Sequence, residues 1–252
     1  MSRTVTHAVV LAAGRGKRMM PLTANCPKPL LPVAGVPLLE RILRGLSAGG
    51  IRETIIVHGY LGEMIEAYFG AGERVGMRLR YCRQETPDGT GGALRHLDAL
   101  CGDHPFMLHW GDILIDPSNY PRLLAAYAAT PVSPVCLLGL NWMEDPAIGA
   151  AVYQEAGRIV KIIEKPAPGT STTPWNNAGA MVLDPRIWPY IHRLTLSSRG
   201  EYEFTEALHQ MIANGDPVLP FELTGLWSDV GTPEVLEKLN GDPVVRGWDS
   251  EE

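Results

Sequence analysis

The sequence lacks the patterns that mark small metal-binding or disulfide-rich domains. It has only four cysteines in 252 residues, and no two of them form a Cys-x-x-Cys pair. The seven histidines form neither a His-Glu-x-x-His motif nor a pair spaced four residues apart. We therefore expect reduced, structural thiols and assign no chemistry to cysteine or histidine.

Long apolar runs and an excess of positive charge are also missing. Near the start, only residues 8–13 form an apolar run, which is too short to span a membrane and lacks a signal-peptide cleavage pattern. Asp and Glu number 28 against 22 Lys and Arg, whereas proteins that grip nucleic acid by its phosphates present a basic surface. We expect a cytoplasmic protein that binds neither membrane nor nucleic acid and acts on small molecules.

Short apolar runs alternate with segments of helical period in the first part of the chain. Residues around Leu38–Leu46 have the helical period, for example, and lie between two of these runs. Such alternation is typical of βαβ units, which build a mostly parallel sheet. The predicted fold class is α/β, with a Rossmann-like, mostly parallel sheet. The predicted strands lie at 7–13, 54–58, 77–82 and 106–110, with a further helix near 92–100.

After about residue 140, strand-like pieces follow one another and the helical segments come late. This order predicts an added antiparallel portion that carries the second half of a binding cleft. No repeat with a period of 20–50 residues appears, so we expect no β-helix domain. We predict a single domain over 1–240 with halves at 1–140 and 141–240, and a frayed tail at 241–252. The later predicted elements are strands at 150–154, 157–164, 179–184 and 217–224, and helices at 201–214 and 232–239.

The loop after the first predicted strand carries positive charge, although the chain as a whole is acidic. Gly14 and Gly16 have no Cβ, so backbone N–H groups can approach an anion where open α/β sheets bind ligands. Polyphosphate is the ligand that this arrangement favours. Five basic residues precede the first carboxylate, Glu40: Arg3, Arg15, Lys17, Arg18 and Lys28.

Two well-known phosphate-binding signatures do not fit this loop. A dinucleotide-binding fingerprint needs a third glycine where Met19 stands. A P-loop needs Ser or Thr after Lys17, but Arg18 follows it. A solvated basic turn without a ligand stays open as an alternative.

A long ordered motif covers the same loop and the residues after it. It reads Gly14-x-Gly16-x-Arg18-x-x-Pro21-Leu22-Thr23, then Pro27-Lys28-Pro29-Leu30-Leu31-Pro32-Val33 and Gly35-x-Pro37. This motif resembles the signature of the sugar-1-phosphate nucleotidyltransferases, the NDP-sugar pyrophosphorylases. It departs at Ala13, where many members have Gly, and at Lys17, where thymidylyl- and glucose-type members usually have Thr. These departures affect the assignment of the subfamily and not that of the family.

Further segments similar to this family extend to about residue 239. Residues 84–94 are similar to its base-recognition loop, Glu164-Lys165-Pro166 to its sugar-phosphate segment, and Asn177-Ala178-Gly179 to a sugar-contacting turn. Gly111-Asp112 and the segment around Asp229 resemble the parts that supply metal-binding carboxylates. Each has an ordinary structural alternative, such as an aspartate that caps a helix or a lysine at a strand end.

The resemblance implies transfer of a nucleotidyl group from a nucleoside triphosphate (NTP) to a sugar 1-phosphate, with release of pyrophosphate, by Mg²⁺-assisted in-line attack. It assigns catalytic roles to Arg18 and Lys28, and Mg²⁺ binding to Asp112 and Asp229. It makes 1–140 the nucleotide-binding half and 141–240 the sugar-phosphate-binding half. The implied nucleotide-binding residues are Ala13, Gly14, Gly16, Gln84, Gly89 and Thr90, and the implied sugar-phosphate-binding residues are Gly149, Glu164, Lys165 and Asn177.

The base, the sugar and the assembly are less determined. Gln84 with Pro87-Asp88-Gly89 favours UTP or dTTP, whereas residues 89–94 also resemble guanylyltransferase loops for mannose or heptose 1-phosphate. A non-catalytic homologue that binds nucleotide sugars is an alternative of another class, and a nicotinamide-dependent oxidoreductase is a third. Members of the family are often homo-oligomers, so we expect a dimer or tetramer.

Overall fold

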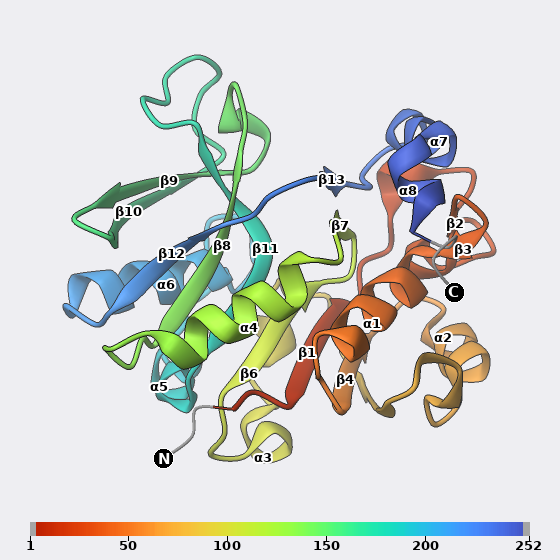
Figure 1. Ribbon diagram of the computed structural model, residues 1–252, viewed down its shortest axis with the longest axis horizontal. Coiled ribbons are helices and arrows are strands. Elements are labelled where there is room, and N and C mark those ends of the chain that lie inside the picture. The colour runs from red at the N-terminus through yellow and green to blue at the C-terminus, as the bar shows by residue number, and fades with distance from the viewer. Residues whose placement is uncertain (1–3, 249–252) are drawn as a thin grey trace. The chain divides into compact units, whose positions relative to one another are not determined.

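The computed structural model describes residues 4–248, which fall into two compact units (Figure 1). Unit 1 contains residues 4–7, then Thr86–Leu108 and Arg122–Thr224. Unit 2 contains Ala8–Glu85, His109–Pro121 and residues 225–248. Each unit is therefore assembled from segments that are far apart in the sequence. Among the described residues, no helix has both the length and the apolar character that crossing a membrane requires.

Unit 2 is built on three strands in the order β1-β4-β5, and β4 and β5 are parallel. Figure 1 shows β1 and β4 side by side. Two short antiparallel pairs, β2 with β3 and β7 with β13, complete its strands. The elements are β1 (His7–Ala12), β2 (Pro32–Val33), β3 (Val36–Pro37), α1 (Leu38–Ala48), β4 (Glu53–His58), α2 (Gly62–Phe69), β5 (Arg78–Arg83), β7 (Ile113–Ile115), β13 (Trp227–Asp229), α7 (Pro233–Gly241) and α8 (Pro243–Gly247), with the 3-10 turns η1 (Lys17–Met19), η2 (Lys28–Leu30) and η3 (Glu73–Val75).

The apolar positions of α1 explain why it forms and where it packs. Leu39, Ile42, Leu43 and Leu46 recur at helical spacing, and all four are fully buried. The helix ends at Ala48, and the amide of the next residue, Gly49, donates to the carbonyl of Gly45 at 2.9 Å. The predicted helix around Leu38–Leu46 is therefore confirmed.

Unit 1 contains the antiparallel portion that the sequence predicts. Strand β9 pairs antiparallel with β10, and β11 pairs antiparallel with β8 and β9. Strand β12 joins β8 in parallel, and α6 packs on β10 and β12. The elements are η4 (Gly92–Leu94), α3 (Asp98–Cys101), β8 (Cys136–Trp142), η5 (Pro146–Ile148), β9 (Ala150–Glu155), β10 (Arg158–Glu164), β11 (Trp175–Leu183), η6 (Pro185–Ile187), α5 (Trp188–His192), α6 (Phe204–Ala213) and β12 (Val218–Glu222); β6 (Phe106–Trp110) and α4 (Asn119–Ala129) each begin in one unit and end in the other.

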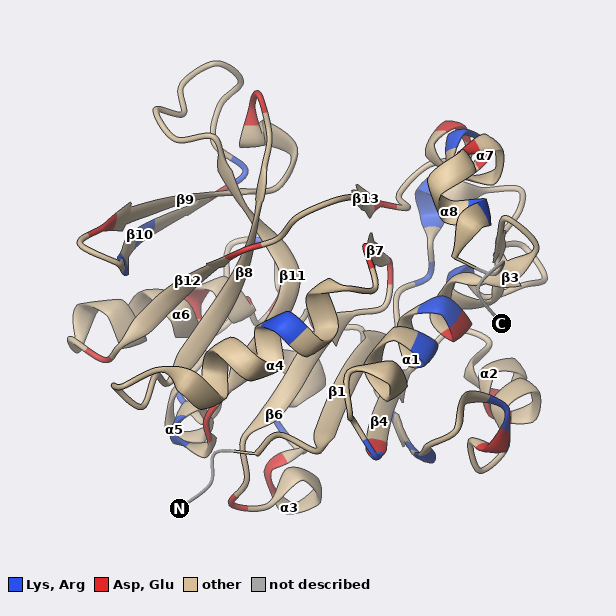
Figure 2. Ribbon diagram, viewed as in Figure 1, with Lys and Arg blue, Asp and Glu red and all other residues tan. Residues whose placement is uncertain are grey.

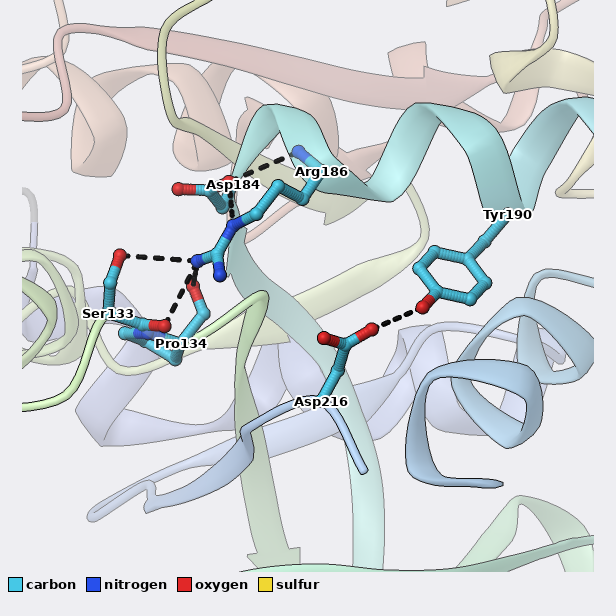
Figure 3. Close-up of polar contacts among 6 residues, drawn as sticks. All are labelled: Ser133, Pro134, Asp184, Arg186, Tyr190 and Asp216. Carbon is cyan, nitrogen blue, oxygen red and sulfur yellow. Dashed lines mark hydrogen bonds and ion pairs between the residues drawn. The ribbon is translucent and has the colours of Figure 1, made fainter. Parts of the chain in front are cut away.

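A polar network fastens the end of β11 to neighbouring segments of unit 1 (Figure 3). Arg186 Nε donates to Asp184 Oδ1 at 2.7 Å, and its Nη2 donates to the carbonyl of Ser133 at 3.0 Å. Nearby, the hydroxyl of Tyr190 donates to Asp216 Oδ2. The Arg186 contacts thus join the segment before β8 to the turn after β11.

The structure corrects several element boundaries and adds elements that were not predicted. The helix expected over 92–100 is only two short turns, η4 and α3, because the amides of Arg95 and Leu97 donate to the carbonyls three residues back, at 3.2 and 3.0 Å, as in a 3-10 turn. Strand β11 begins at Trp175, earlier than expected, because the strand-averse Asn176 is satisfied by side-chain bonds. Helix α4 and strand β8 are among the elements that the sequence pattern did not predict.

The expectation of a frayed tail at 241–252 is wrong up to Gly247. Residues 243–247 form α8, in which Val245 is fully buried. Asp242 accepts a hydrogen bond from the amide of Val244 at 2.8 Å and caps this helix. The remainder of the expected tail, from 249, lies outside the described residues.

Candidate active site

The loop after β1 is held in shape by Gly16 and Thr23. Gly16 adopts the left-handed region, with φ 63°, where a Cβ would lie 3.0 Å from Thr23 Cγ2. The fully buried Thr23 donates its hydroxyl to the carbonyl of Gly16 at 2.9 Å. The loop that carries Arg18 is thus anchored from inside unit 2. Thr23 belongs to the motif, but its anchoring role was visible only in the structure.

Four charged side chains meet in unit 2. Lys28 Nζ lies 3.0 Å from Asp112 Oδ2 and 3.9 Å from Asp229 Oδ1. Arg18 Nη2 lies 4.0 Å from Asp229 Oδ2. In Figure 2 the ribbon has the colour of Lys and Arg along the segment after β1 and the colour of Asp and Glu beside β7 and β13. We call Arg18, Lys28, Asp112 and Asp229 the Lys28 cluster.

Long-range pairing places the two aspartates at the same end of a small sheet. In the β7–β13 pair, Asp229 lies opposite Ile113, the residue next to Asp112. The amide of Val230 donates to the carbonyl of Asp112 at 2.9 Å. Lys28 begins η2 after Pro27, and its ammonium group reaches both carboxylates although its residue is only 7% exposed.

The electrostatics of the cluster suit a divalent cation. Burial and the neighbouring Asp112 raise the pKa of Asp229, while Lys28 and Arg18 oppose this increase. Asp229 Oδ1 is buried and has no hydrogen-bond partner among the described residues. A carboxylate oxygen in this state fits a cation that prefers oxygen ligands, as Mg²⁺ does.

The cluster contains too few ligands for an all-protein metal cage. In residues 4–248 no group of three or more His, Cys, Asp or Glu side chains is arranged to hold a metal ion. Mg²⁺ usually takes one or two carboxylates and completes its coordination with water and substrate phosphates. The Asp112 and Asp229 pair therefore fits Mg²⁺ bound together with a phosphate ligand.

The four residues predicted to bind sugar phosphate come together in unit 1. The amide of Lys165 donates to the carbonyl of Gly149 at 2.8 Å, and Glu164 lies opposite Ala150 in the β9–β10 pair. Asn177 follows Asn176, whose Oδ1 accepts from the amide of Ala150 at 2.8 Å. Strand β9 is thus the common neighbour of all four.

Two of these residues are held in unusual states. Lys165 has φ 44°, a left-handed conformation that is rare for a residue with a side chain and rarer still before a proline. Such strain concentrates where function requires it. Asn177 is 3% exposed, and its Nδ2 has no hydrogen-bond partner within the part of the chain that the structure describes. A buried amide donor without a partner fits a hydroxyl or phosphate oxygen of a ligand.

A buried asparagine network supports this part of unit 1. Asn176 Nδ2 donates to Asn141 Oδ1 and to the carbonyl of Asn177, at 2.8 and 2.9 Å. At Gly149 an added Cβ would lie 2.0 Å from Asn176 Oδ1, so only glycine fits beside the network. Asn141 and Asn176 were not predicted from the sequence, although polar residues inside an apolar strand pattern are a usable signal.

The predicted nucleotide-binding residues are distributed over both units. Ala13, Gly14, Gly16 and Gln84 belong to unit 2, where the amide of Gln84 donates to the carbonyl of His58 at 2.8 Å. Gly89, with φ 98°, and Thr90 belong to unit 1. Thr90 Oγ1 accepts a hydrogen bond from the amide of Phe204 at 3.2 Å, a contact that the sequence did not indicate.

Comparison with known proteins identifies relatives along almost the whole chain. Residues 7–242 match a family model described as nucleotidyl transferase. A mannose-1-phosphate guanylyltransferase of Mycobacterium tuberculosis is 32% identical over 98% of this chain and 67% of its own length. A bifunctional protein GlmU of Methanococcus aeolicus is 32% identical over 92% of this chain and 53% of its length. The UTP–glucose-1-phosphate uridylyltransferase AglF of Haloferax volcanii is 31% identical over 90% of this chain and 92% of its own length.

The chain spans about half to two thirds of the length of the first two of these relatives. Solved structures agree on the fold. A Bacillus anthracis protein described as a glucose-1-phosphate thymidylyltransferase has a TM-score of 0.85 at 24% identity, covering 95% of both chains. A UDP-glucose pyrophosphorylase complexed with UDP-glucose has a TM-score of 0.84 at 20% identity, covering 98% of this chain and 100% of its own.

Proposed function

Because the chain belongs to the nucleotidyl transferase family, we propose that it transfers a nucleotidyl group from an NTP to a sugar 1-phosphate, giving an NDP-sugar and pyrophosphate. The observation that carries the proposal is the Lys28 cluster, in which one buried ammonium group lies 3.0 and 3.9 Å from two carboxylates. The α/β fold and the family match over residues 7–242 support it.

The reaction brings two anions together. A phosphate oxygen of the sugar 1-phosphate attacks the α-phosphorus of the NTP, and the bond from that phosphorus to the bridging oxygen of pyrophosphate breaks. Two unit charges about 4 Å apart repel by about 4 kcal/mol at an effective dielectric constant near 20. Catalysis therefore depends on fixed positive charge and on positioning, without a covalent enzyme intermediate.

The residues of the Lys28 cluster supply that charge. Lys28 would contact the phosphates near the reacting phosphorus, and Arg18 would hold the triphosphate and the departing pyrophosphate. Asp112 and Asp229 would hold Mg²⁺, which when bound neutralises charge on the phosphates. Backbone N–H groups around Gly14 and Gly16 would cradle the triphosphate.

In unit 1, the four residues around β9 would bind the sugar 1-phosphate. Lys165 would pair with its phosphate, and Glu164 and Asn177 would hydrogen-bond the sugar hydroxyls. The exposed Lys165 and the Nδ2 group of Asn177, which has no hydrogen-bond partner in residues 4–248, supply the donors that such a ligand needs. Gly89 and Thr90 of unit 1 would bind the nucleotide, as would Gln84 of unit 2.

For the base we propose UTP or dTTP, on the Gln84 and Pro87-Asp88-Gly89 pattern and the similarity to a uridylyltransferase. GTP with mannose or heptose 1-phosphate is a second candidate, favoured by the 32% identity to a mannose-1-phosphate guanylyltransferase. Both candidates use the same site and differ only in the ligands that they select.

A pyrophosphate-release matrix tests the proposal. ATP, GTP, CTP, UTP and dTTP are each combined with several hexose and heptose 1-phosphates, with and without Mg²⁺. We expect product in at least one UTP or dTTP combination, only with Mg²⁺, and none from Lys28→Met. Lys238→Met, at an exposed lysine of α7, is the matched control and should keep full activity. No product in any combination would leave only a non-catalytic binding protein, and product without Mg²⁺ would remove the metal role.

A further inference from the structure

The first turn of α6 contacts both the base-recognition loop and the sugar-phosphate strand. At its start the amide of Phe204 donates to Thr90 Oγ1 at 3.2 Å. One residue later, Thr205 Oγ1 donates to Glu164 Oε2 at 3.0 Å. Two adjacent residues of one helix thus bond to two segments that the proposed function assigns to different substrates, and all these residues lie in unit 1.

Thr90 acts as the cap of α6 from another part of the chain. The residue at the N-cap, Glu203, directs its carboxylate to Ser197 and Arg199 at 2.9 and 3.0 Å. The first amides of a helix need acceptors from outside the helix. Thr90 supplies one of them, so a shift of the base-recognition loop changes how the first turn of α6 is held.

The segment before α6 forms backbone hydrogen bonds with the base-recognition loop. The amide of Tyr202 donates to the carbonyl of Asp88 at 2.7 Å, and Gly91 N donates to the carbonyl of Tyr202 at 2.8 Å. The guanidinium group of Arg95 lies over the Tyr202 ring, 4.3 Å from its centroid. At Gly89 an added Cβ would lie 2.6 Å from Tyr202 O, so the two segments are in close contact.

The other side of the turn is fixed to the strand that ends at Glu164. Thr205 is 8% exposed, whereas Glu164 is exposed, so a buried hydroxyl orients an exposed carboxylate. One turn along, His209 Nε2 lies 2.8 Å from the carbonyl of Ile162 on β10. Two contacts thus join the helix to the strand near Glu164.

We infer that Thr90 and Thr205 are positioning residues, and that the first turn of α6 couples the nucleobase loop to Glu164. Binding of the nucleotide orders the loop, the loop holds the turn through Thr90, and the turn holds Glu164 in the orientation that receives the sugar 1-phosphate. The inference rests on the proposed function and adds to it a route by which one substrate improves the binding of the other.

The test is steady-state kinetics with both substrates varied, using the most active pair from the pyrophosphate-release matrix. In the wild-type enzyme, saturating NTP should lower the KM for sugar 1-phosphate. Thr205→Val keeps the shape of the side chain but removes the donor to Glu164, and should raise this KM by roughly tenfold. Thr90→Val should raise the KM for both substrates and abolish the dependence of one KM on the other substrate.

Three comparisons separate positioning from general damage. Thr205→Ser and Thr90→Ser keep the hydroxyl groups and should restore the substrate coupling. Thr130→Val removes a hydroxyl whose bond within the described part of the chain is local, to the carbonyl of Ala126 at 2.7 Å, and should leave both KM values unchanged. If the two positions act through one turn, Thr90→Val combined with Thr205→Val should raise the KM for sugar 1-phosphate by less than the product of the single effects.

Failure of this inference can be distinguished from failure of the proposed function. A wild-type enzyme that makes product, together with valine variants whose KM values and coupling are unchanged, would overturn the inference alone. Equal effects of Thr130→Val would do the same. A wild-type chain that releases no pyrophosphate in any combination would overturn the proposed function, and the inference with it.

Discussion

Lys28 Nζ donates to Asp112 Oδ2 at 3.0 Å, although 84 positions separate the two residues. The lysine side chain is 9% exposed and the aspartate side chain 43%, so a buried cation meets a carboxylate that solvent still reaches. The same ammonium group is 3.9 Å from Asp229 and offsets the repulsion between the two carboxylates. This arrangement keeps two acidic side chains close together before any phosphate ligand binds.

Removing either carboxylate charge should impair turnover strongly. We expect Asp112→Asn and Asp229→Asn each to lower the rate of pyrophosphate release by about 10²–10³, the scale found for loss of one preorganised electrostatic group. The rate is measured over a Mg²⁺ titration, in which both variants should need more Mg²⁺ than the wild type. Asp242→Asn, in the cap of α8, is the control. Near-full activity in Asp112→Asn would show that this residue holds no metal.

The buried His109 should make the protein less stable in mild acid. Its Nδ1 lies 2.8 Å from the carbonyl of Trp110 and its Nε2 3.3 Å from the hydroxyl of Tyr120. Burial lowers the pKa of His109 from 6.5 to about 4, although the Trp110 carbonyl and Asp112 act in the opposite direction. Below pH 6.5, His109 therefore binds a proton in the unfolded chain but stays neutral in the folded chain.

The stabilising contribution of neutral His109 is thus complete above that pH and is lost as the pH falls toward 4, by up to about 1.4 kcal/mol per pH unit. Urea unfolding of the wild type and of His109→Gln between pH 7.5 and pH 5 measures the effect. The glutamine variant should show the smaller dependence of unfolding free energy on pH. Equal dependence in both proteins would contradict the assignment, because the other histidines are common to both.

Glycine to alanine substitutions in two helices should have opposite effects. Gly45 lies inside α1, and an added Cβ would be 2.2 Å from Cε2 of Tyr120, whose residue is 1% exposed. Gly45→Ala should therefore lower the free energy of unfolding by about 1–3 kcal/mol through overpacking. Gly241, the last residue of α7, has no other atom within 4 Å of an added Cβ, so Gly241→Ala should be neutral or slightly stabilising. Chemical denaturation measures both, and a stabilising Gly45→Ala would show that the Tyr120 ring moves aside.

Loss of the Arg186 network in Figure 3 should destabilise unit 1 without affecting chemistry. The hydrogen bond from Arg186 to Asp184 raises the pKa of the guanidinium group, which stays charged at any physiological pH. Arg186→Met removes this bond and those to Ser133 and Pro134, and should cost about 1–2 kcal/mol of unfolding free energy. Arg193→Met, at the exposed end of α5, is the matched control. A kcat change in Arg186→Met larger than that in the control would indicate a role beyond stability.

Local pattern predicted the parts of the molecule whose signals lie within a few residues. The apolar spacing of Leu39 to Leu46 predicts α1, which the structure confirms, whereas phosphate binding by the loop from Gly14 to Lys28 stays a prediction. Strand β8 and helix α4 were missed, and the strand β11 was predicted too short because Asn176 and Asn177 interrupt its apolar pattern. The asparagines are tolerated there because Asn141, from another strand, accepts a hydrogen bond from Asn176.

The sequence by itself determined the α/β class and the composition of a glycine-opened basic loop, because backbone freedom and hydrophobic periodicity are local properties. Only the tertiary structure decided that Lys28 bridges Asp112 and Asp229, that Thr23 anchors Gly16, and that Thr205 bonds to Glu164. These contacts depend on strand pairing and helix packing between distant segments. No pattern within a single stretch of chain specifies the distance between two such residues, since that distance follows from the packing of the whole core.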